Sequence, residues 1–393
     1  MSMEGASVVI PVAAPASSVA FHRSLGRRGI RTIAVAEDDS APSFRSRYCD
    51  ETVVVTNPRE DVIGYKDALL SLSMRPDVKT IVPLREEDIY VLSKYRSEFA
   101  EHIATPWPSF DTLRTVHDRE LLFDAARKAG VSVPYTTTPE EVDDWEQQLV
   151  IKSRFALLTE DYITDSQKSG IIETGSARFL EPGERPDIES LRSEFKHTPH
   201  IQRFTNGTEY SLGVLYEDGE PVVETQKRII RGIKYYCGPS VYHESVHIPE
   251  LEEIGRRLLT HIDWHGPADV DIILDEETGE YKLLEINPRF WATVSMEMHA
   301  GFDFPYYYWQ LAQGEQVQPN YPPTTGIATH YLPGELSYLL SVLREDHPMI
   351  ERPSVKSSAW EIATSLVKDR RFDLLDIDDP RPFVSAMASI VRG

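Results

Sequence analysis

The stretch that decides the fold is residues 266–290, "GPADVDIILDEETGEYKLLEINPRF". Two runs in it, ADVDIIL and YKLLEIN, have the pattern of strands, and DEETGE between them is a turn signal with Gly279 near its end. If the turn is centred near Thr278, the runs pair as an antiparallel hairpin with Asp271 opposite Glu285. Directly opposed residues lie ~5 Å apart at Cβ. The stretch therefore predicts a hairpin that brings two carboxylates together.

Side chains two residues apart share one face of a strand, which puts Asp269 beside Asp271 and Asn287 beside Glu285. Two carboxylates this close repel each other unless a cation lies between them. The set Asp271, Glu285 and Asn287 offers only oxygen ligands, which suit Mg²⁺ or Mn²⁺ and not zinc. A solvated acidic face is the alternative. Arg289 on the same face favours a metal site, because a metal with an arginine commonly clamps a transferring phosphoryl group.

The composition is that of an acidic globular protein of two or three domains. The chain has 393 residues, 41% of them hydrophobic, and a formal net charge of −22. That charge argues against nucleic-acid and anionic-membrane partners, which require basic surface. It would suit a high-salt cytoplasm; the alternative is an ordinary acidic protein. Two cysteines, Cys49 and Cys237, cannot form a disulfide framework, so a cytoplasmic location is expected.

Residues 7–110 alternate short β-branched runs with helical stretches, as the βαβ units of a Rossmann-like domain do. The four runs are SVVIPV, RTIAVA, ETVVVT and KTIVPL. Glu4 stands where a signal peptide would need basic residues, so the first run is expected to be a strand. The loop after it lacks G-x-G-x-x-G, which argues against a dinucleotide site. No stretch approaches the ~20 apolar residues of a membrane span.

LLEINPRF after GPADVDIIL resembles the metal-binding hairpin of the ATP-grasp superfamily, particularly its carboxylate–amine ligases. Four motifs in that family's order extend the resemblance over some 170 residues. It implies an α/β ATP-grasp fold with an N-terminal Rossmann-like domain and a mostly helical C-terminal tail. The expected divisions are a Rossmann-like domain at 1–112, linker helices and a small lid at 113–200, the large subdomain with the metal site at 201–330, and a helical extension at 331–393.

The same resemblance implies which residues meet the nucleotide. Lys152 in LVIKS matches the family's lysine that contacts the α- and β-phosphates, and Arg119 in VHDRELL replaces a second family lysine. Gln202, Arg203 and Phe204 would read adenine through their backbone, and Glu209 would accept the ribose hydroxyls. By themselves, a strand lysine or a Glu after a turn carries little information, because a lysine at a strand edge often reaches out to water.

Two further segments concern the phosphates. The loop after Lys152 is usually rich in glycine in the family, but here it has only Gly170 and Gly175. Either SGIIETGSAR covers the phosphates, or side chains bind them instead, with Lys168 and Arg178 as candidates. ETQKRIIRGIKYY is basic in an acidic chain and is expected to meet the γ-phosphate and the substrate carboxylate. Its cations are Lys227, Arg228, Arg231 and Lys234. Among them we favour Arg228 as a catalytic residue, beside Arg289; a solvated basic strand is the alternative.

The stretch HESVH, residues 243–247, matches the zinc pattern H-E-x-x-H, which requires a helix. Pro239 precedes it and Pro249 follows His247 by two residues, which leaves no room for that helix. We expect an extended segment, with the helix beginning near Pro249. The match is interpreted as accidental, and no zinc is expected.

The resemblance implies an ATP-dependent ligase that uses ATP and Mg²⁺ (or Mn²⁺). It would activate a carboxylate as an acylphosphate and join it to an amine, with small-molecule substrates as partners and a homodimer as an open option. Carboxylase or carbamoyl-phosphate chemistry is a related alternative. A catalytically silent ATP-binding regulatory protein is the alternative from another class, supported by the glycine-poor loop and by Arg119.

Overall fold

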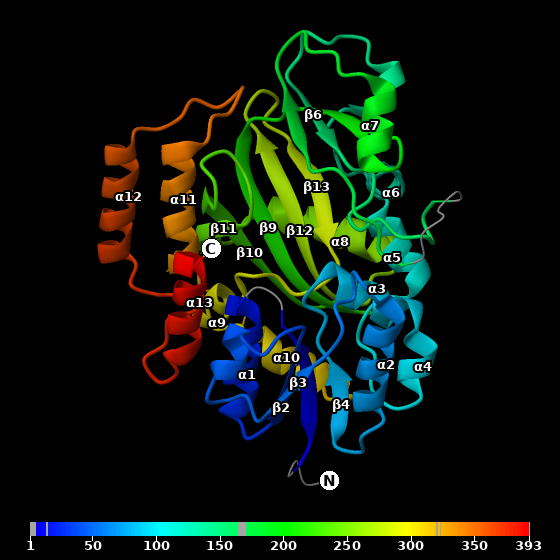
Figure 1. The fold of residues 1–393 in the computed structure, drawn as a ribbon, viewed down its shortest axis with the longest axis vertical. Coiled ribbons are helices and arrows are strands. Elements are labelled where there is room, and N and C mark those ends of the chain that lie inside the picture. The colour runs from blue at the N-terminus through cyan, green and yellow to red at the C-terminus, as the bar shows by residue number, and fades with distance from the viewer. Residues whose placement is uncertain (1–4, 13–14, 164–169, 320, 323, 393) are drawn as a thin grey trace.

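The computed structural model describes residues 5–12, 15–163, 170–319, 321–322 and 324–392. Three sheets organise these residues, and helices cover the sheets and form a C-terminal extension beside the largest one (Figure 1). The α/β class expected from the sequence is therefore confirmed. In the described parts of the chain, no helix is both long enough and apolar enough to cross a membrane.

The N-terminal sheet is parallel, with strand order β3-β2-β1-β4. All four runs singled out in the sequence are strands: β1 Ser7–Pro11, β2 Arg31–Ala36, β3 Glu51–Val54 and β4 Val78–Ile81. The helices that connect or follow them are α1 Pro15–Gly26, the short 3-10 helix Pro42–Arg45, α2 Val62–Ser73, α3 Glu86–Lys94 and α4 Arg96–Ala100. The central strand β1 is buried along its whole length, as a strand covered by helices on both faces must be.

The second sheet, which we call the lid sheet, is small and antiparallel. Its strand order is β5-β8-β6-β7, and its strands are β5 Thr136–Thr137, β6 Leu149–Lys152, β7 Arg178–Leu180 and β8 His200–Arg203. The helices α5 Phe110–His117 and α6 Arg119–Lys128 precede it, and the 3-10 helix Pro139–Glu141 and α7 Ile188–Phe195 lie within it. The sheet has a core of its own. Because β8 belongs to this sheet, a division after Arg203 follows the strands better than the expected one after residue 200.

The third sheet, the large sheet, is antiparallel with strand order β13-β12-β9-β10-β11-β14. Its strands are β9 Gly207–Glu217, β10 Glu220–Gly232, β11 Ser240–Val246, β12 Gly266–Asp275, β13 Tyr281–Asn287 and β14 Ala328–His330. Helices α8 Pro249–His261 and α9 Val294–His299 pack against it, and α10 Phe304–Ala312 packs against α1, α9 and β4. Pro249 occupies the first turn of α8, as the sequence predicted.

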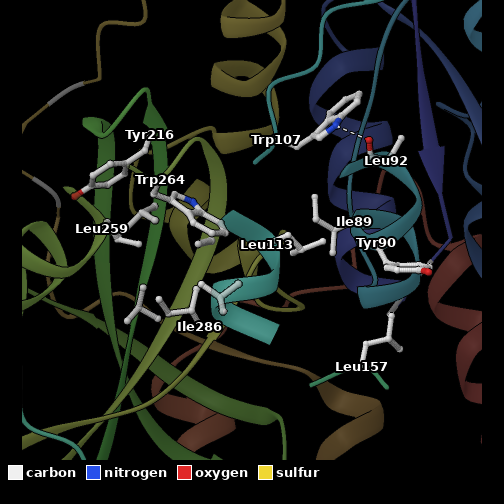
Figure 2. Packing of buried hydrophobic residues seen from close by; sticks show 14 of the residues in the cluster. Ile89, Tyr90, Leu92, Trp107, Leu113, Leu157, Tyr216, Leu259, Trp264 and Ile286 are labelled. Carbon is white, nitrogen blue, oxygen red and sulfur yellow. Dashed lines mark hydrogen bonds between the residues drawn. The ribbon is translucent and has the colours of Figure 1, made fainter. Parts of the chain in front are cut away.

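One hydrophobic core joins the N-terminal domain to the large sheet (Figure 2). Trp107 is fully buried in it and donates its indole N–H to the carbonyl of Leu92 at 3.0 Å. Trp264 and Ile286 belong to the same cluster on the side of the large sheet. Burial of each such side chain contributes roughly 1.5–3 kcal/mol. The shared core fixes the N-terminal domain relative to the hairpin.

The C-terminal extension consists of α11 Leu332–Arg344, α12 Val355–Lys368 and α13 Arg381–Arg392. Residues 369–379, which we call the clasp, tie this extension to the N-terminal domain. Asp379 accepts hydrogen bonds from Arg23 Nε at 3.1 Å, Ser46 Oγ at 2.7 Å and the amide of Arg47 at 2.9 Å. Helices α11, α12 and α13 make the tail largely helical, as expected.

The HESVH stretch is extended, as predicted, because residues 240–246 form β11. His243 is fully buried, with Nδ1 3.1 Å from Ser240 Oγ and Nε2 2.8 Å from Thr329 Oγ1. Both ring nitrogens are therefore engaged by neighbouring hydroxyls. His247 lies beyond the end of the strand, with its ring 4.0 Å from Glu252.

Candidate functional site

The predicted hairpin is present as β12 and β13, and its register places Asp271 directly opposite Glu285, as the sequence predicted. Asp269 is opposite Asn287, and the register shifts by a bulge just after Asp271. Asn287 Nδ2 donates to Asp271 Oδ2 at 2.9 Å. The amide oxygen of Asn287 thereby faces away from Asp271, and 3.3 Å separates it from Arg289 Nη2.

The next strands extend this face of the sheet. On β9, Ser211 is opposite Asp271 and also opposite Lys227 of β10. Opposed residues in an antiparallel pair share one face. We call this surface the polar face: Glu209, Ser211, Lys227, Asp269, Asp271, Glu285 and Asn287. Gly213 lets the ring of Trp291 pack against the sheet, since a Cβ there would lie 2.2 Å from that ring.

Two cations come to the polar face from outside the large sheet. Arg119, the first residue of α6, donates from Nη2 to Glu285 Oε2 at 2.7 Å and from Nη1 to the carbonyl of Ser153 at 2.8 Å. Lys152 ends strand β6 of the lid sheet. Burial lowers the pKa of Lys152, Arg119 lowers it further, and Glu285 and Glu209 act in the opposite direction. The residues assigned to the phosphates by resemblance therefore share one electrostatic environment with the acidic hairpin.

The carboxylates of the polar face have unequal surroundings: Glu285 pairs with Arg119 and Asp269 with Lys227, whereas Asp271 lies beside both carboxylates. Burial raises the pKa of Asp271 well above its ordinary value, and Asp269 and Glu285 raise it further against the opposing effect of Lys227. Burial also favours the neutral form of Glu285, but Arg119 and Lys152 outweigh it, so the pKa of Glu285 is lowered. A cation between the two carboxylates would relieve this repulsion.

The donor set fits a hard divalent cation, because it consists of two carboxylates and an amide oxygen. Among the residues that the structure describes, no three His, Cys, Asp or Glu side chains are arranged to hold a metal ion. Glu285 would therefore have to share its carboxylate between Arg119 and a metal. The residues fit Mg²⁺ held together with phosphate oxygens better than a metal bound by the protein alone.

Arg289 lies just beyond the end of β13, on the side of the polar face. Its Nε donates to Glu86 Oε1 at 2.8 Å and its Nη1 to the carbonyl of Phe290 at 3.1 Å. Glu86 is the first residue of α3 in the N-terminal domain. Sequence reasoning missed this partner because some 200 positions separate it from the hairpin and no local pattern marks it.

Arg228 does not join this group. It lies on the opposite face of β10, opposite Tyr210, and its Nη2 donates to Glu244 Oε1 at 2.7 Å on the exposed surface. The neighbouring Lys227 points the other way, is buried, and donates from Nζ to Asp269 Oδ1 at 2.9 Å. Neighbouring residues on a strand face opposite sides of the sheet, so the strand register decides whether Lys227 or Arg228 lies on the polar face. The sequence alone did not give that register.

The other cations that were expected near the phosphates have different surroundings. Arg231 is buried against Glu335 at 2.7 Å, and Lys234 Nζ donates to Glu345 at 2.8 Å, so both hold the C-terminal extension. Arg178 begins β7 with an exposed side chain. Lys168 lies outside the described residues.

The hinge between the lid sheet and the large sheet carries the expected adenine segment. Gln202 is buried with Nε2 3.4 Å from Thr136 Oγ1. The amide of Arg203 donates to the carbonyl of Tyr135 at 2.9 Å, and the amide of Phe204 donates to that of Gln148 at 2.8 Å. Both amides are thus used by the lid, and an adenine contact here would require carbonyls or the amide that follows. Glu209 lies on β9 near Lys152, whose charge acts on it.

Comparisons with known proteins agree with this architecture. A family model described as "ATP-grasp in the biosynthetic pathway with Ter operon" matches residues 200–334, and a model of the PylC-like N-terminal domain matches residues 17–105. A curated "Putative urea carboxylase" of Emericella nidulans is 24% identical over an alignment of 282 residues that covers 66% of this chain. The chain spans only 22% of that relative's length.

Solved structures show the same fold. The biotin carboxylase domain of 2-oxoglutarate carboxylase from Hydrogenobacter thermophilus, in complex with MgADP, ADP and bicarbonate, superposes with a TM-score of 0.62 at 14% identity, covering 79% of this chain and 70% of that one. N5-carboxyaminoimidazole synthetase from Staphylococcus aureus superposes with a TM-score of 0.59 at 13% identity, covering 92% of this chain and 97% of that one. By sequence, residues 200–334 are thus similar to the ATP-grasp family and residues 17–105 to the PylC-like N-terminal domain, and the solved structures share the fold of the chain.

Proposed function

We propose that the protein is an ATP-dependent ligase that activates a carboxylate as an acylphosphate and joins it to an amine, releasing ADP and phosphate. The observation that carries this proposal is the meeting of three elements at one face. The hairpin supplies Asp271, Glu285 and Asn287, the lid sheet supplies Lys152, and α6 supplies Arg119, which contacts Glu285 at 2.7 Å. A nucleoside triphosphate with Mg²⁺ matches this site, because its phosphates would meet the cations and its Mg²⁺ would meet the carboxylates.

The residues divide into phosphate and metal roles. Lys152 and Arg119 would neutralise phosphate oxygens from the lid side, and Arg119 is already oriented by the carbonyl of Ser153. Asp271, Glu285 and Asn287 would hold Mg²⁺, which neutralises charge on the transferring phosphoryl group when it is bound. The similar carboxylase domain from Hydrogenobacter thermophilus is a complex with MgADP, which supports the same ligand class for this fold.

The proposed reaction has two steps. A carboxylate oxygen attacks the γ-phosphorus in line, the bond to the β,γ-bridging oxygen breaks, and ADP leaves. The amine nitrogen then attacks the carbonyl carbon of the acylphosphate, the bond from that carbon to the phosphate oxygen breaks, and the amine loses a proton. Arg289, which lies beside Asn287, would stabilise charge on the transferring group.

Carboxylation is the second candidate, with bicarbonate as the acid. It is favoured by the sequence similarity to the "Putative urea carboxylase" and by the structural likeness to a carboxylase domain solved with bicarbonate. The chemistry of the first step is unchanged, because bicarbonate attacks the same γ-phosphorus. The two candidates differ only in the acid that reaches the polar face.

An acylphosphate trap tests the proposal. Purified protein with MgATP is offered a panel of carboxylic acids and bicarbonate, and hydroxylamine replaces the amine. A carboxylic acid that supports ligation should yield a hydroxamate in step with ADP, whereas bicarbonate should increase ADP release alone. Calorimetric titration of MgADP runs beside the trap. Nucleotide binding with no acid-dependent ADP release would replace both candidates with a silent ATP-binding protein.

A further inference from the structure

A chain of hydrogen bonds runs from the hairpin through the N-terminal domain to the segment that follows Lys152. Arg289 Nε donates to Glu86 Oε1 at 2.8 Å. The other carboxylate oxygen of Glu86 lies 3.1 Å from His117 Nε2, and His117 Nδ1 lies 3.0 Å from the hydroxyl of Tyr162. Three parts of the molecule that are far apart in sequence are therefore joined by four side chains.

The chemistry of these groups fixes the direction of the bonds to Glu86 and, for a neutral His117, of the bond to Tyr162. A carboxylate only accepts hydrogen bonds, so His117 must carry a proton on Nε2 to reach Glu86. In the neutral imidazole Nδ1 is then an acceptor, and it accepts a hydrogen bond from the hydroxyl of Tyr162. Each member thus orients the next, and the tautomer of His117 is set by its two partners.

The far end of the chain is firmly placed. The ring of Tyr162 stacks on Phe155 at 5.7 Å and on Phe110 at 6.2 Å between centroids. His117 is completely buried. Leu157 belongs to the same core cluster as Tyr90 of α3, and Figure 2 shows the two near each other. The position of the Tyr162 hydroxyl therefore reports how residues 155–163 pack on the N-terminal domain.

The near end reaches the proposed metal residues. Arg289 Nη2 lies 3.3 Å from Asn287 Oδ1, and Asn287 donates to Asp271 at 2.9 Å. The side chains of Arg289 and Glu86 are 25% and 18% exposed. An ion pair that is partly open to water adds little stability by itself. Its main consequence is geometric, because it fixes where the guanidinium lies relative to Asn287.

We propose that Glu86 is a positioning residue that holds Arg289 for phosphoryl transfer, and that His117 and Tyr162 make this position depend on the packing of residues 155–163. The inference rests on the proposed function, in which Arg289 meets the transferring group. The four residues form one relay: Tyr162, His117, Glu86 and Arg289.

Steady-state turnover of MgATP, measured as ADP release, tests the role of Glu86 in catalysis. Glu86→Gln keeps the shape of the side chain but removes its charge, and should lower kcat at least ~10-fold while KM for ATP changes less than ~2-fold, because Lys152 and Arg119 still hold the phosphates. Tyr162→Phe should lower kcat by ~3-fold or more. Glu87→Gln is the matched control, since the adjacent Glu87 pairs with Arg59 outside the relay. An equal loss in Glu86→Gln and Glu87→Gln would overturn the positioning role.

Hydrogen exchange of the nucleotide-free protein tests the relay without any turnover. Tyr162→Phe should speed exchange of the Arg289 and Phe290 amides by ~5-fold or more, although Tyr162 touches neither residue. Tyr216→Phe is the control, because it removes a buried phenol–carboxylate bond to Glu224 elsewhere in the large sheet. Exchange within ~2-fold of that control would overturn the relay.

The two measurements separate the possible failures. If the wild-type protein shows no ATP turnover, the proposed function fails, and the exchange result still decides whether the relay exists. If exchange responds while kcat in Glu86→Gln equals that of the control, the relay is real but does not position a group used in turnover, which overturns the proposal.

Discussion

Asp379 in the clasp and Asp271 on the polar face meet opposite surroundings. Asp379 is 1% exposed, and its oxygens accept from Arg23, Ser46 and the amide of Arg47. Asp271 accepts from Asn287, and burial raises its pKa, with a further contribution from two neighbouring carboxylates. A buried charge that is fully paired supports the fold, whereas a buried carboxyl beside two other carboxylates, as Asp271 is, marks a place where a cation would be stabilised.

The largest effect is expected at Glu285. Glu285→Gln keeps the side-chain volume but removes the charge opposite Asp271, so ATP turnover should fall at least ~1000-fold, or about 4 kcal/mol of transition-state stabilisation. ADP release under saturating MgATP measures this. Glu276→Gln, in the exposed turn of the same hairpin, should behave like wild type. Retention of a tenth of the turnover would contradict the hairpin as the site.

A substitution in the clasp should lower the free energy of unfolding and leave ATP turnover nearly unchanged. Asp379→Ala removes the carboxylate 3.1 Å from the buried Arg23, so the free energy of unfolding should fall by about 3–5 kcal/mol. Urea denaturation measures this, with the exposed Asp378→Ala as the control. Turnover per folded molecule should stay within a factor of about two. A loss of turnover in Asp379→Ala with an unchanged free energy of unfolding would contradict the structural role of the clasp.

Two adjacent residues of β10 sharpen the contrast further. Lys227 faces Asp269 on the polar face, so Lys227→Met should lower turnover at least ~10-fold. Arg228 pairs with Glu244 on the other face, so Arg228→Met should change turnover less than ~2-fold and stability by less than ~1 kcal/mol. Turnover is normalised to the folded fraction from circular dichroism. A larger loss of turnover in Arg228→Met than in Lys227→Met would instead support Arg228 as the catalytic residue, as the sequence analysis favoured.

The hairpin and the β10 strand also show what a sequence can predict. The register of Asp271 and Glu285 followed from one turn, because the two strands are neighbours in the chain. The choice between Lys227 and Arg228 required the pairing of β10 with β9, and one residue of register changes the face. Glu86 could not be found, because its contact with Arg289 depends on how two domains pack.

A pH-dependent effect is expected at Glu297, which is 1% exposed and lies 3.9 Å from Lys227. Burial raises its pKa to about 7, and Lys227 only partly opposes this. A carboxyl whose folded pKa exceeds its unfolded pKa contributes stability at low pH that is lost as pH rises from ~4.5 to 7. Glu297→Gln should remove this decline and add ~1–3 kcal/mol at pH 8. Chemical denaturation between pH 4.5 and 8 measures it, and an unchanged slope would contradict the raised pKa.

The central claim is that the repelling carboxylates of the polar face hold a divalent cation together with a nucleotide. Electron paramagnetic resonance of Mn²⁺ tests it most directly, because bound Mn²⁺ loses the signal of the free ion. The account predicts that ADP sharply increases Mn²⁺ binding to the wild-type protein, and that Glu285→Gln and Asn287→Ala each abolish this increase while Glu276→Gln retains it. Equal ADP-dependent Mn²⁺ binding in all four proteins would contradict the account.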